Sequence, residues 1–334
     1  MTVLIFLPFA CKKSSSNSQQ PPPQDSSFFA KGADVSWLSQ MEASNYSFFD
    51  ANGNKKDCMQ ILKDLGTNSI RLRVWVNPTG SWCGTQDLVK KALRAKNLGL
   101  KIMIDFHYSD SWADPGQQNK PASWDSLSTN DLVTTLHDYT RNVLDSLQNS
   151  GIIPQWVQVG NETNDGMLWE DGRASTHMAT FASLVTAGYN ACKEVSDSIK
   201  VIVHISNGYD NTLFRWVFDG LNANGGKYDI IGMSLYPEVS NWQSLNEQCL
   251  SNMTDMVSRY GKPVMIAEVG MDATASTTCQ SFLEDLITKT KSLSGHMGLG
   301  VFYWEPEAYN WQGYTKGAFD SNGKPTVALS AFSN

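Results

Sequence analysis

The sequence predicts a single-domain α/β protein of the (β/α)8, or TIM-barrel, class. Eight strand-like segments recur at intervals of 32 to 55 residues, and helix-like runs lie between them. Several of these strands are apolar at successive positions rather than at alternate ones, which is typical of parallel strands covered on both faces. The segments end near Asp34, Arg71, His107, Glu162, His204, Tyr236, Glu268 and Trp304.

The first half of the chain contains the clearest helix signals. The run Cys58–Leu65 is closed by Gly66, and a second run that begins at Asp87 reaches Gly99. Glycine just past the last apolar position is the expected helix stop. The segment Lys101–Phe106 follows as a buried strand.

The second half repeats the same unit. Strand-like runs occur at Val157–Glu162, Val201–Val203 and Val264–Glu268. An open, doubly wound sheet is the main alternative, but no glycine-rich phosphate loop follows the first strand. Eight units that end on polar or aromatic residues therefore favour the closed barrel.

Composition limits the classes of function. The chain has 334 residues, of which 41% are hydrophobic, and 26 basic against 33 acidic residues give a net charge of -7. Such a chain can bury a large core. No cluster of Lys and Arg is present, so nucleic acid is not expected as a partner.

The N-terminus resembles a bacterial lipoprotein signal. A short apolar stretch from Val3 ends at Ala10 and Cys11, and a segment rich in Ser, Gln and Pro follows. We expect residues 1–11 to be a signal peptide ending at a lipidated Cys11, 12–27 a disordered tether and 28–334 the catalytic barrel. The protein would then be exported and anchored to the outer membrane or cell surface. A tail with an incidental cysteine is the alternative.

Five further cysteines fit no zinc or redox spacing. Export would permit disulfides. Cys58 with Cys83, and Cys249 with Cys279, are the pairings that the expected elements allow, and Cys192 would stay unpaired.

Two strand-like runs end on a carboxylate, at Glu162 and Glu268. In a closed barrel the C-terminal strand ends share one rim, where active sites lie. Paired carboxyl groups suit glycoside hydrolysis, in which one group attacks the sugar and the other protonates the departing oxygen. Arg71 and Arg73 share one strand face, and an inward arginine needs an anionic partner, for which Glu268 is a candidate.

Several motifs resemble glycoside hydrolase family 53, the arabinogalactan endo-β-1,4-galactanases. The resemblance runs from about Lys31 to the C-terminus. Its motifs are Arg71–Pro78, Asp105–Gln117, Val159–Thr163 with Gly166–Trp169, and Gly300–Pro306. It implies a retaining reaction with Glu162 as the acid/base and Glu268 as the nucleophile.

In retaining enzymes the carboxyl groups lie about 5 to 5.5 Å apart. Two charges at that distance repel by about 3 kcal/mol at an effective dielectric of 20, which is about two pKa units. Arg71 beside Glu268 would keep the nucleophile ionised and leave the proton on Glu162.

The resemblance also implies further site residues. Asn161 matches the residue that binds the sugar 2-hydroxyl, Tyr236 matches the tyrosine that contacts the nucleophile, and Trp304 matches the platform under the sugar being cleaved. The remaining substrate-binding candidates are Arg71, His107, His204, Asp34, Trp75 and Trp112.

The expected partners are β-1,4-galactan and galacto-oligosaccharides, and we expect a monomer. The chemistry needs no cofactor, although some relatives carry a structural calcium ion. Two alternatives remain: a mannanase-like, xylanase-like or cellulase-like hydrolase on a related barrel, and a non-catalytic glycan-binding lipoprotein.

Overall fold

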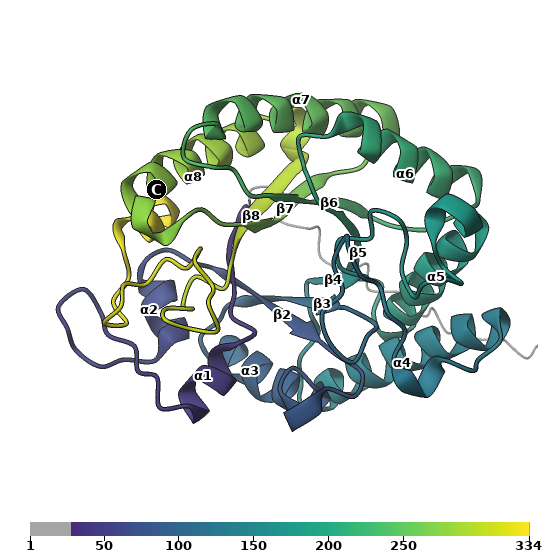
Figure 1. Ribbon diagram of the computed structural model, residues 1–334, viewed down its shortest axis with the longest axis horizontal. Coiled ribbons are helices and arrows are strands. Elements are labelled where there is room, and N and C mark those ends of the chain that lie inside the picture. The colour runs from purple at the N-terminus through teal and green to yellow at the C-terminus, as the bar shows by residue number, and fades with distance from the viewer. Residues whose placement is uncertain (1–27, 334) are drawn as a thin grey trace, which may run out of the picture.

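Eight parallel strands close into a barrel in the order β1 to β8, and the helices form a ring outside it (Figure 1). The computed structural model describes residues 28–333. The predicted (β/α)8 architecture is therefore confirmed. The expected signal peptide, Cys11 and tether lie outside the described residues.

The strands are β1 Ala30–Asp34, β2 Ser69–Val74, β3 Lys101–Phe106, β4 Trp156–Val159, β5 Lys200–Ile205, β6 Ile230–Leu235, β7 Val264–Val269 and β8 Gly298–Trp304. The α-helices are α1 Leu38–Ala43, α2 Cys58–Asp64, α3 Thr85–Asn97, α4 Thr129–Asn149, α5 Ala174–Val195, α6 Asn211–Ala223, α7 Trp242–Tyr260 and α8 Ser276–Lys291. Short 3-10 segments are η1 Thr79–Ser81, η2 Ala122–Trp124, η3 Ala273–Ala275, η4 Ser294–His296 and η5 Val327–Phe332.

Side-chain caps define where several helices begin. Asp57 accepts a hydrogen bond from the Gln60 amide at the start of α2, and Asp210 accepts one from the Leu213 amide at the start of α6. Each cap satisfies a backbone donor that the helix leaves free. Gly66 lies just past α2 with φ near 100°, a conformation that favours glycine.

The barrel interior divides into an apolar layer and a polar layer. The apolar layer lies toward the N-terminal strand ends, and its members are Ala30, Met103, Trp156, Ile202, Ile230, Met265 and Phe302. Side chains two positions further along the same strands, such as Asp105 after Met103 and Gln158 after Trp156, belong to the polar layer, because side chains alternate along a strand. The polar layer supports the C-terminal rim, where the site lies.

Strand β7 breaks this alternation. Met265 belongs to the apolar layer, yet Glu268, three residues later, also contacts interior groups. The register between β6 and β7 shifts between Met233 and Ser234, so that Glu268 pairs with Ser234. A bulge of this kind re-aims the side chains that follow it, and here it directs Glu268 to the interior.

The predicted disulfides are wrong: all five cysteines in the described part of the chain are free and buried. Cys83 lies 3.7 Å from the carbonyl oxygen of Ser36, and Cys279 lies 3.7 Å from the hydroxyl of Tyr303. Cys249 packs instead beside Gly208, after β5. Cys83, Cys249 and Cys279 thus contact other groups, and no S–S bond joins either expected pair.

Candidate active site

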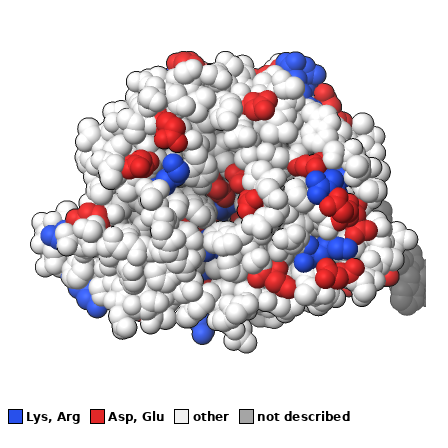
Figure 2. Space-filling view, in the orientation of Figure 1, with Lys and Arg blue, Asp and Glu red and all other residues white. Residues whose placement is uncertain are grey.

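A cleft of about 560 Å³ opens at the C-terminal end of the barrel. Figure 2 shows that this face is hollowed near its centre and that acidic side chains lie within the hollow. The lining residues are Trp37, His107, Trp112, Ala113, Asp114, Asn161, Glu162, Tyr236, Glu268, Trp304, Gln312, Gly313, Tyr314 and Lys316.

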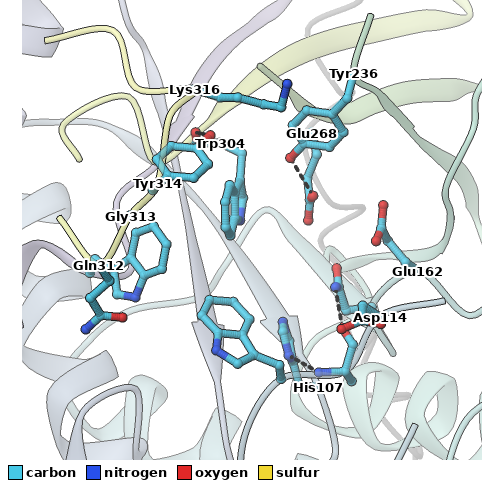
Figure 3. A pocket seen from close by; sticks show the side chains of 14 residues that line it. His107, Asp114, Glu162, Tyr236, Glu268, Trp304, Gln312, Gly313, Tyr314 and Lys316 are labelled. Atoms are coloured by element: carbon cyan, nitrogen blue, oxygen red, sulfur yellow. Dashed lines mark hydrogen bonds between the residues drawn. The ribbon is translucent and has the colours of Figure 1, made fainter. Parts of the chain in front are cut away.

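The two predicted catalytic glutamates both line this cleft, and their carboxyl groups face each other across it (Figure 3). Glu268 is on β7. Glu162 is not on a strand, because β4 ends at Val159. Gly160 has φ near 88°, where a Cβ atom would lie 2.5 Å from Thr163, and Glu162 itself has φ near 44°. This turn carries Glu162 into the cleft, and its unusual backbone is typical of functional positions.

Glu268 has two hydrogen-bond donors. Its Oε1 lies 2.7 Å from an Arg71 nitrogen, and its Oε2 accepts from the Tyr236 hydroxyl at 2.9 Å. Burial raises the pKa of Glu268 to about 8, Glu162 and Asp105 add to this, and Arg71 and Tyr236 oppose it.

Glu162 has a different environment. Its Oε1 accepts a hydrogen bond from Ser234 at 2.6 Å, and its Oε2 makes no hydrogen bond to a residue of the described chain. Burial also raises the pKa of Glu162, against the effects of Ser234 and Arg71. With both pKa values raised, the pair retains a proton near neutral pH.

Arg71 connects the polar layer beneath the cleft. It donates to Asp34 at 2.6 Å, to Gln158 at 2.6 Å and to Asn161 at 2.9 Å, and one of its nitrogens lies 3.0 Å from Asp105. Although burial opposes ionisation of Asp105, Arg71 and His107 hold the pKa of its carboxyl group below the ordinary value. The result is a rigid array of charges that fixes Asn161 and Glu268.

Arg73 pairs with a different carboxylate from the one that Arg71 contacts on β7. It forms an ion pair with Glu305, and its guanidinium lies 4.4 Å from the ring centre of Trp112 and 5.2 Å from that of Trp37. Both tryptophans line the cleft, and Trp304 packs 5.2 Å from Trp37. Aromatic rings in such an arrangement offer flat apolar surfaces for sugar faces.

His107 is held in one orientation at the cleft wall. Its Nδ1 accepts hydrogen bonds from the Trp75 indole at 3.2 Å and from the Ala113 amide at 3.1 Å. Its Nε2 therefore carries the proton, and it lies 2.9 Å from Asp105.

Four predicted substrate-binding residues do not line the cleft. Asp34, Arg71 and His204 are at most 1% exposed, and half-buried Trp75 supports His107 from the side. Direct contact of these four residues with the sugar stays a prediction, and the contacts that the structure shows for them are with other residues of the site. The residues brought together as predicted are Glu162, Glu268, His107, Asn161, Tyr236, Trp304 and Trp112.

Several residues in or beneath the cleft were not predicted from the sequence. Gln158 and Ser234 are polar residues within otherwise apolar strands, a signal that places them inside the barrel. Tyr314 and Lys316 come from the loop after β8, where no periodic pattern marks them. In Figure 3 the Lys316 side chain extends along the cleft wall toward Tyr236.

The chain is similar along most of its length to a family of glycosyl hydrolases. Residues 30–332 match glycosyl hydrolase family 53. The chain is 33% identical over 311 residues to an arabinogalactan endo-β-1,4-galactanase of Cellvibrio japonicus, covering 84% of this chain and 81% of that protein. An endo-β-1,4-galactanase of Bacillus subtilis is 32% identical, covering 83% of this chain and 70% of that protein. A solved fungal β-1,4-galactanase superposes with a TM-score of 0.84 at 29% identity, covering 90% of this chain and 98% of that one.

Proposed function

Because this chain belongs to glycosyl hydrolase family 53, we propose that it is a retaining, endo-acting hydrolase of β-1,4-galactan, the side chain of pectic arabinogalactan. The observation that carries the proposal is the pair of carboxyl groups, Glu162 and Glu268, which face each other in one cleft. The names of the galactanase relatives support the substrate.

We assign the nucleophile to Glu268. Burial raises the pKa of Glu268, but Arg71 and Tyr236 donate to its two oxygens, and both contacts favour the carboxylate over the neutral acid. The carboxylate attacks the anomeric carbon and forms a glycosyl-enzyme ester as the glycosidic C–O bond breaks. Arg71 and Tyr236 keep the attacking group in one orientation, so little reorganisation accompanies the reaction.

We assign the acid/base to Glu162. Its Oε2 has no hydrogen-bond partner in the described chain, so this oxygen is available to the glycosidic oxygen. Glu162 gives its proton to the departing sugar and then takes one from the water that hydrolyses the ester. The raised pKa of its carboxyl group suits the first of these steps.

The residues around this pair support sugar binding. Asn161 is fixed by Arg71 and by a hydrogen bond from its own amide to the Ala113 carbonyl at 2.8 Å, and it would bind the 2-hydroxyl. Trp304 would lie under the sugar being cleaved, with Trp112 beside it. Both ring nitrogens of His107 are already hydrogen-bonded within the protein, so this residue would contact the sugar through the edge of its ring.

Substrate assays test this proposal. Reducing sugar should be released from galactan, while mannan, xylan and cellulose stay intact. The newly formed product should be the β-anomer when it is followed by proton NMR during the first minutes. Cleavage of mannan or cellulose with galactan untouched would overturn the substrate assignment, and binding of galactan without turnover would favour a glycan-binding role.

No step of this mechanism passes through a metal. Within residues 28–333, no group of three or more His, Cys, Asp and Glu side chains could hold a metal ion. The structural calcium ion that the resemblance implies stays a prediction, because calcium also takes backbone carbonyl and amide oxygens as ligands.

We also propose that the protein acts as an exported, monomeric lipoprotein. The sequence around Cys11 supports the lipid anchor. As a separate finding, none of the helices in the described part of the chain is long and apolar enough to cross a membrane. In the native host, Cys11→Ser should move the protein from the membrane fraction to the soluble fraction and leave kcat/KM on galacto-oligosaccharides unchanged. A Cys11→Ser protein that stays in the membrane pellet would contradict the anchor.

A further inference from the structure

A chain of short hydrogen bonds leads away from Glu162 into the barrel. Ser234 Oγ lies 2.6 Å from Glu162 Oε1, and His204 Nε2 lies 2.7 Å from the same hydroxyl oxygen. Ser234 is on β6 and 1% exposed, and His204 is on β5 and fully buried. Neither residue lines the cleft, so both can affect the sugar only through Glu162 or its neighbours.

The directions of these bonds follow from the groups at the far end. Arg71 can only donate, so the side-chain oxygens of Gln158 and Asn161 face it. The Gln158 amide nitrogen therefore lies 3.0 Å from His204 Nδ1 as a donor. Burial and Arg71 lower the pKa of His204 well below its ordinary value, so the ring is neutral.

A neutral ring that accepts at Nδ1 carries its proton on Nε2. His204 Nε2–H then donates to Ser234 Oγ, and the hydroxyl proton of Ser234 points to Glu162 Oε1. Asn161 Oδ1 also lies 3.0 Å from His204 Nδ1, but it already accepts from Arg71 and would accept from His204 only in the other tautomer.

We propose that Ser234, oriented by His204, is a positioning residue that holds Glu162 Oε1 and leaves Oε2 as the oxygen that delivers and recovers the proton. The inference rests on the assignment of Glu162 as the acid/base. A serine that only filled space would leave the carboxyl group free to rotate and to present either oxygen.

The same hydrogen bond stabilises the carboxylate form of Glu162, and so it opposes the effect of burial on the pKa of this group. The charged groups that face Glu162 are Arg71 on β2, Asp105 on β3, Asp114 in the loop after β3 and Glu268 on β7. Substitution of Ser234 leaves all four in place, so a change in the titration of Glu162 reports the lost hydroxyl.

The test is Ser234→Ala, with the Glu162 carboxyl titrated by ¹³C NMR in glutamate-labelled protein and assigned by Glu162→Gln. We expect the pKa of Glu162 to rise by about one unit, the alkaline limb of the kcat/KM profile on galactan to move up by the same amount, and kcat at the optimum to fall by about tenfold. Ser234→Thr, which keeps a hydroxyl, should restore both the titration and the profile.

Ser206→Ala is the matched control. Ser206 follows β5 and binds Asn164 at 2.7 Å rather than Glu162, so its removal should leave the titration of Glu162 unchanged. His204→Gln should move the pKa of Glu162 upward in the wild-type background but not in the Ser234→Ala background, because His204 acts through the serine.

An unchanged Glu162 titration in Ser234→Ala would overturn the inference, as would a His204→Gln effect that persists without the hydroxyl. Failure of the acid/base assignment is a separate result, since Glu162→Gln would then remain active on galactan. The NMR titration would still report the Ser234 hydrogen bond in that case.

Discussion

Arg71 shows how one buried cation can organise several functional groups. Its guanidinium contacts Asp34, Gln158, Asn161 and Glu268. A planar fork with five donors can satisfy such an arrangement, whereas a lysine ammonium cannot. The positions of the Asn161 amide and of Glu268, the proposed nucleophile, are therefore linked through one side chain.

Glu268→Gln should abolish turnover, with a loss of at least about 10⁴-fold in kcat, because an amide cannot form the glycosyl-enzyme ester. The substitution keeps size and polarity, so galacto-oligosaccharides should still bind in titration calorimetry. Glu247→Gln, at an exposed position on α7, serves as the control and should behave as wild type. Substantial residual galactan hydrolysis by Glu268→Gln would remove Glu268 from the role of nucleophile.

Glu162→Ala should lose activity on galactan but form the glycosyl-enzyme at nearly the wild-type rate from dinitrophenyl galactosides, since a good leaving group needs little protonation. Added azide should then accelerate turnover by replacing the water that Glu162 activates. Stopped-flow release of dinitrophenol measures the first step. Equal losses on both substrates would argue against a proton-transfer role.

Among individual residues, those at the ends of strand-like runs and within recognisable motifs could be predicted from the sequence. Glu162, Glu268 and Trp304 were found because each ends a recognisable apolar run. Ser234 could not be assigned a role, because its function depends on a carboxylate that lies 72 residues away in the chain. Only the closed barrel brings these two groups together.

Among the elements, β7 had the least predictable geometry. The run Val264–Glu268 marks a strand, but strict alternation from Met265 would turn Glu268 outward. The bulge depends on pairing with β6 and β8, where the register shifts as well. Local sequence carries no signal for such a shift, whereas the strand positions and the helix ends at Gly66 and Gly99 follow from local patterns.

The loop after β8 contains an unusual pair of carboxyl groups. Glu305 accepts hydrogen bonds from the Trp37 amide at 3.1 and 3.2 Å and pairs with Arg73. Glu307 is fully buried, no donor of the described chain reaches its carboxyl oxygens, and its own protonated carboxyl group donates a hydrogen bond to Glu305. Burial and the charge of Glu305 raise the pKa of Glu307 well above its ordinary value.

The change in the free energy of unfolding caused by Glu307→Gln should therefore be more favourable at pH 8 than at pH 4.5. Wild-type Glu307 keeps its proton when folded, whereas the unfolded chain releases it above a pKa of about 4.3. Between the pKa of the unfolded chain and the raised pKa of the folded protein, the folded state binds more protons than the unfolded state. The free energy of unfolding therefore falls as the pH rises through this range. Glutamine mimics the neutral acid and removes this dependence.

Thermal unfolding at the two pH values measures the effect, with the exposed substitution Glu247→Gln as control. A glutamine variant that is destabilised more at pH 8 than at pH 4.5 would mean that folded Glu307 is ionised.

For the molecule as a whole, the described barrel is stabilised by packing and ion pairs without disulfides. All five cysteines of residues 28–333 are buried thiols, and burial raises the pKa of Cys249 to about 12 and that of Cys279 to about 11. The pairings expected from the sequence failed because spacing along the chain does not reveal which side of a helix a thiol faces.

Native protein carrying Cys11→Ser should consequently react slowly with Ellman's reagent, and all five remaining thiols should react once it is unfolded in guanidinium. Reductant should leave the melting temperature unchanged. A drop of several degrees on reduction would show that a disulfide forms after all.

The chain enters the described barrel at the end opposite the cleft. Phe28 packs 6.3 Å from Trp156, in the apolar layer at the N-terminal strand ends, and β1 begins two residues later at Ala30. A group joined to the chain directly before Phe28, whether a carrier protein or a resin bead, would therefore leave the barrel at the end farthest from the cleft. In an enzyme held in this way the cleft faces the surrounding solvent, and long polymers can reach Glu162 and Glu268 without passing the support.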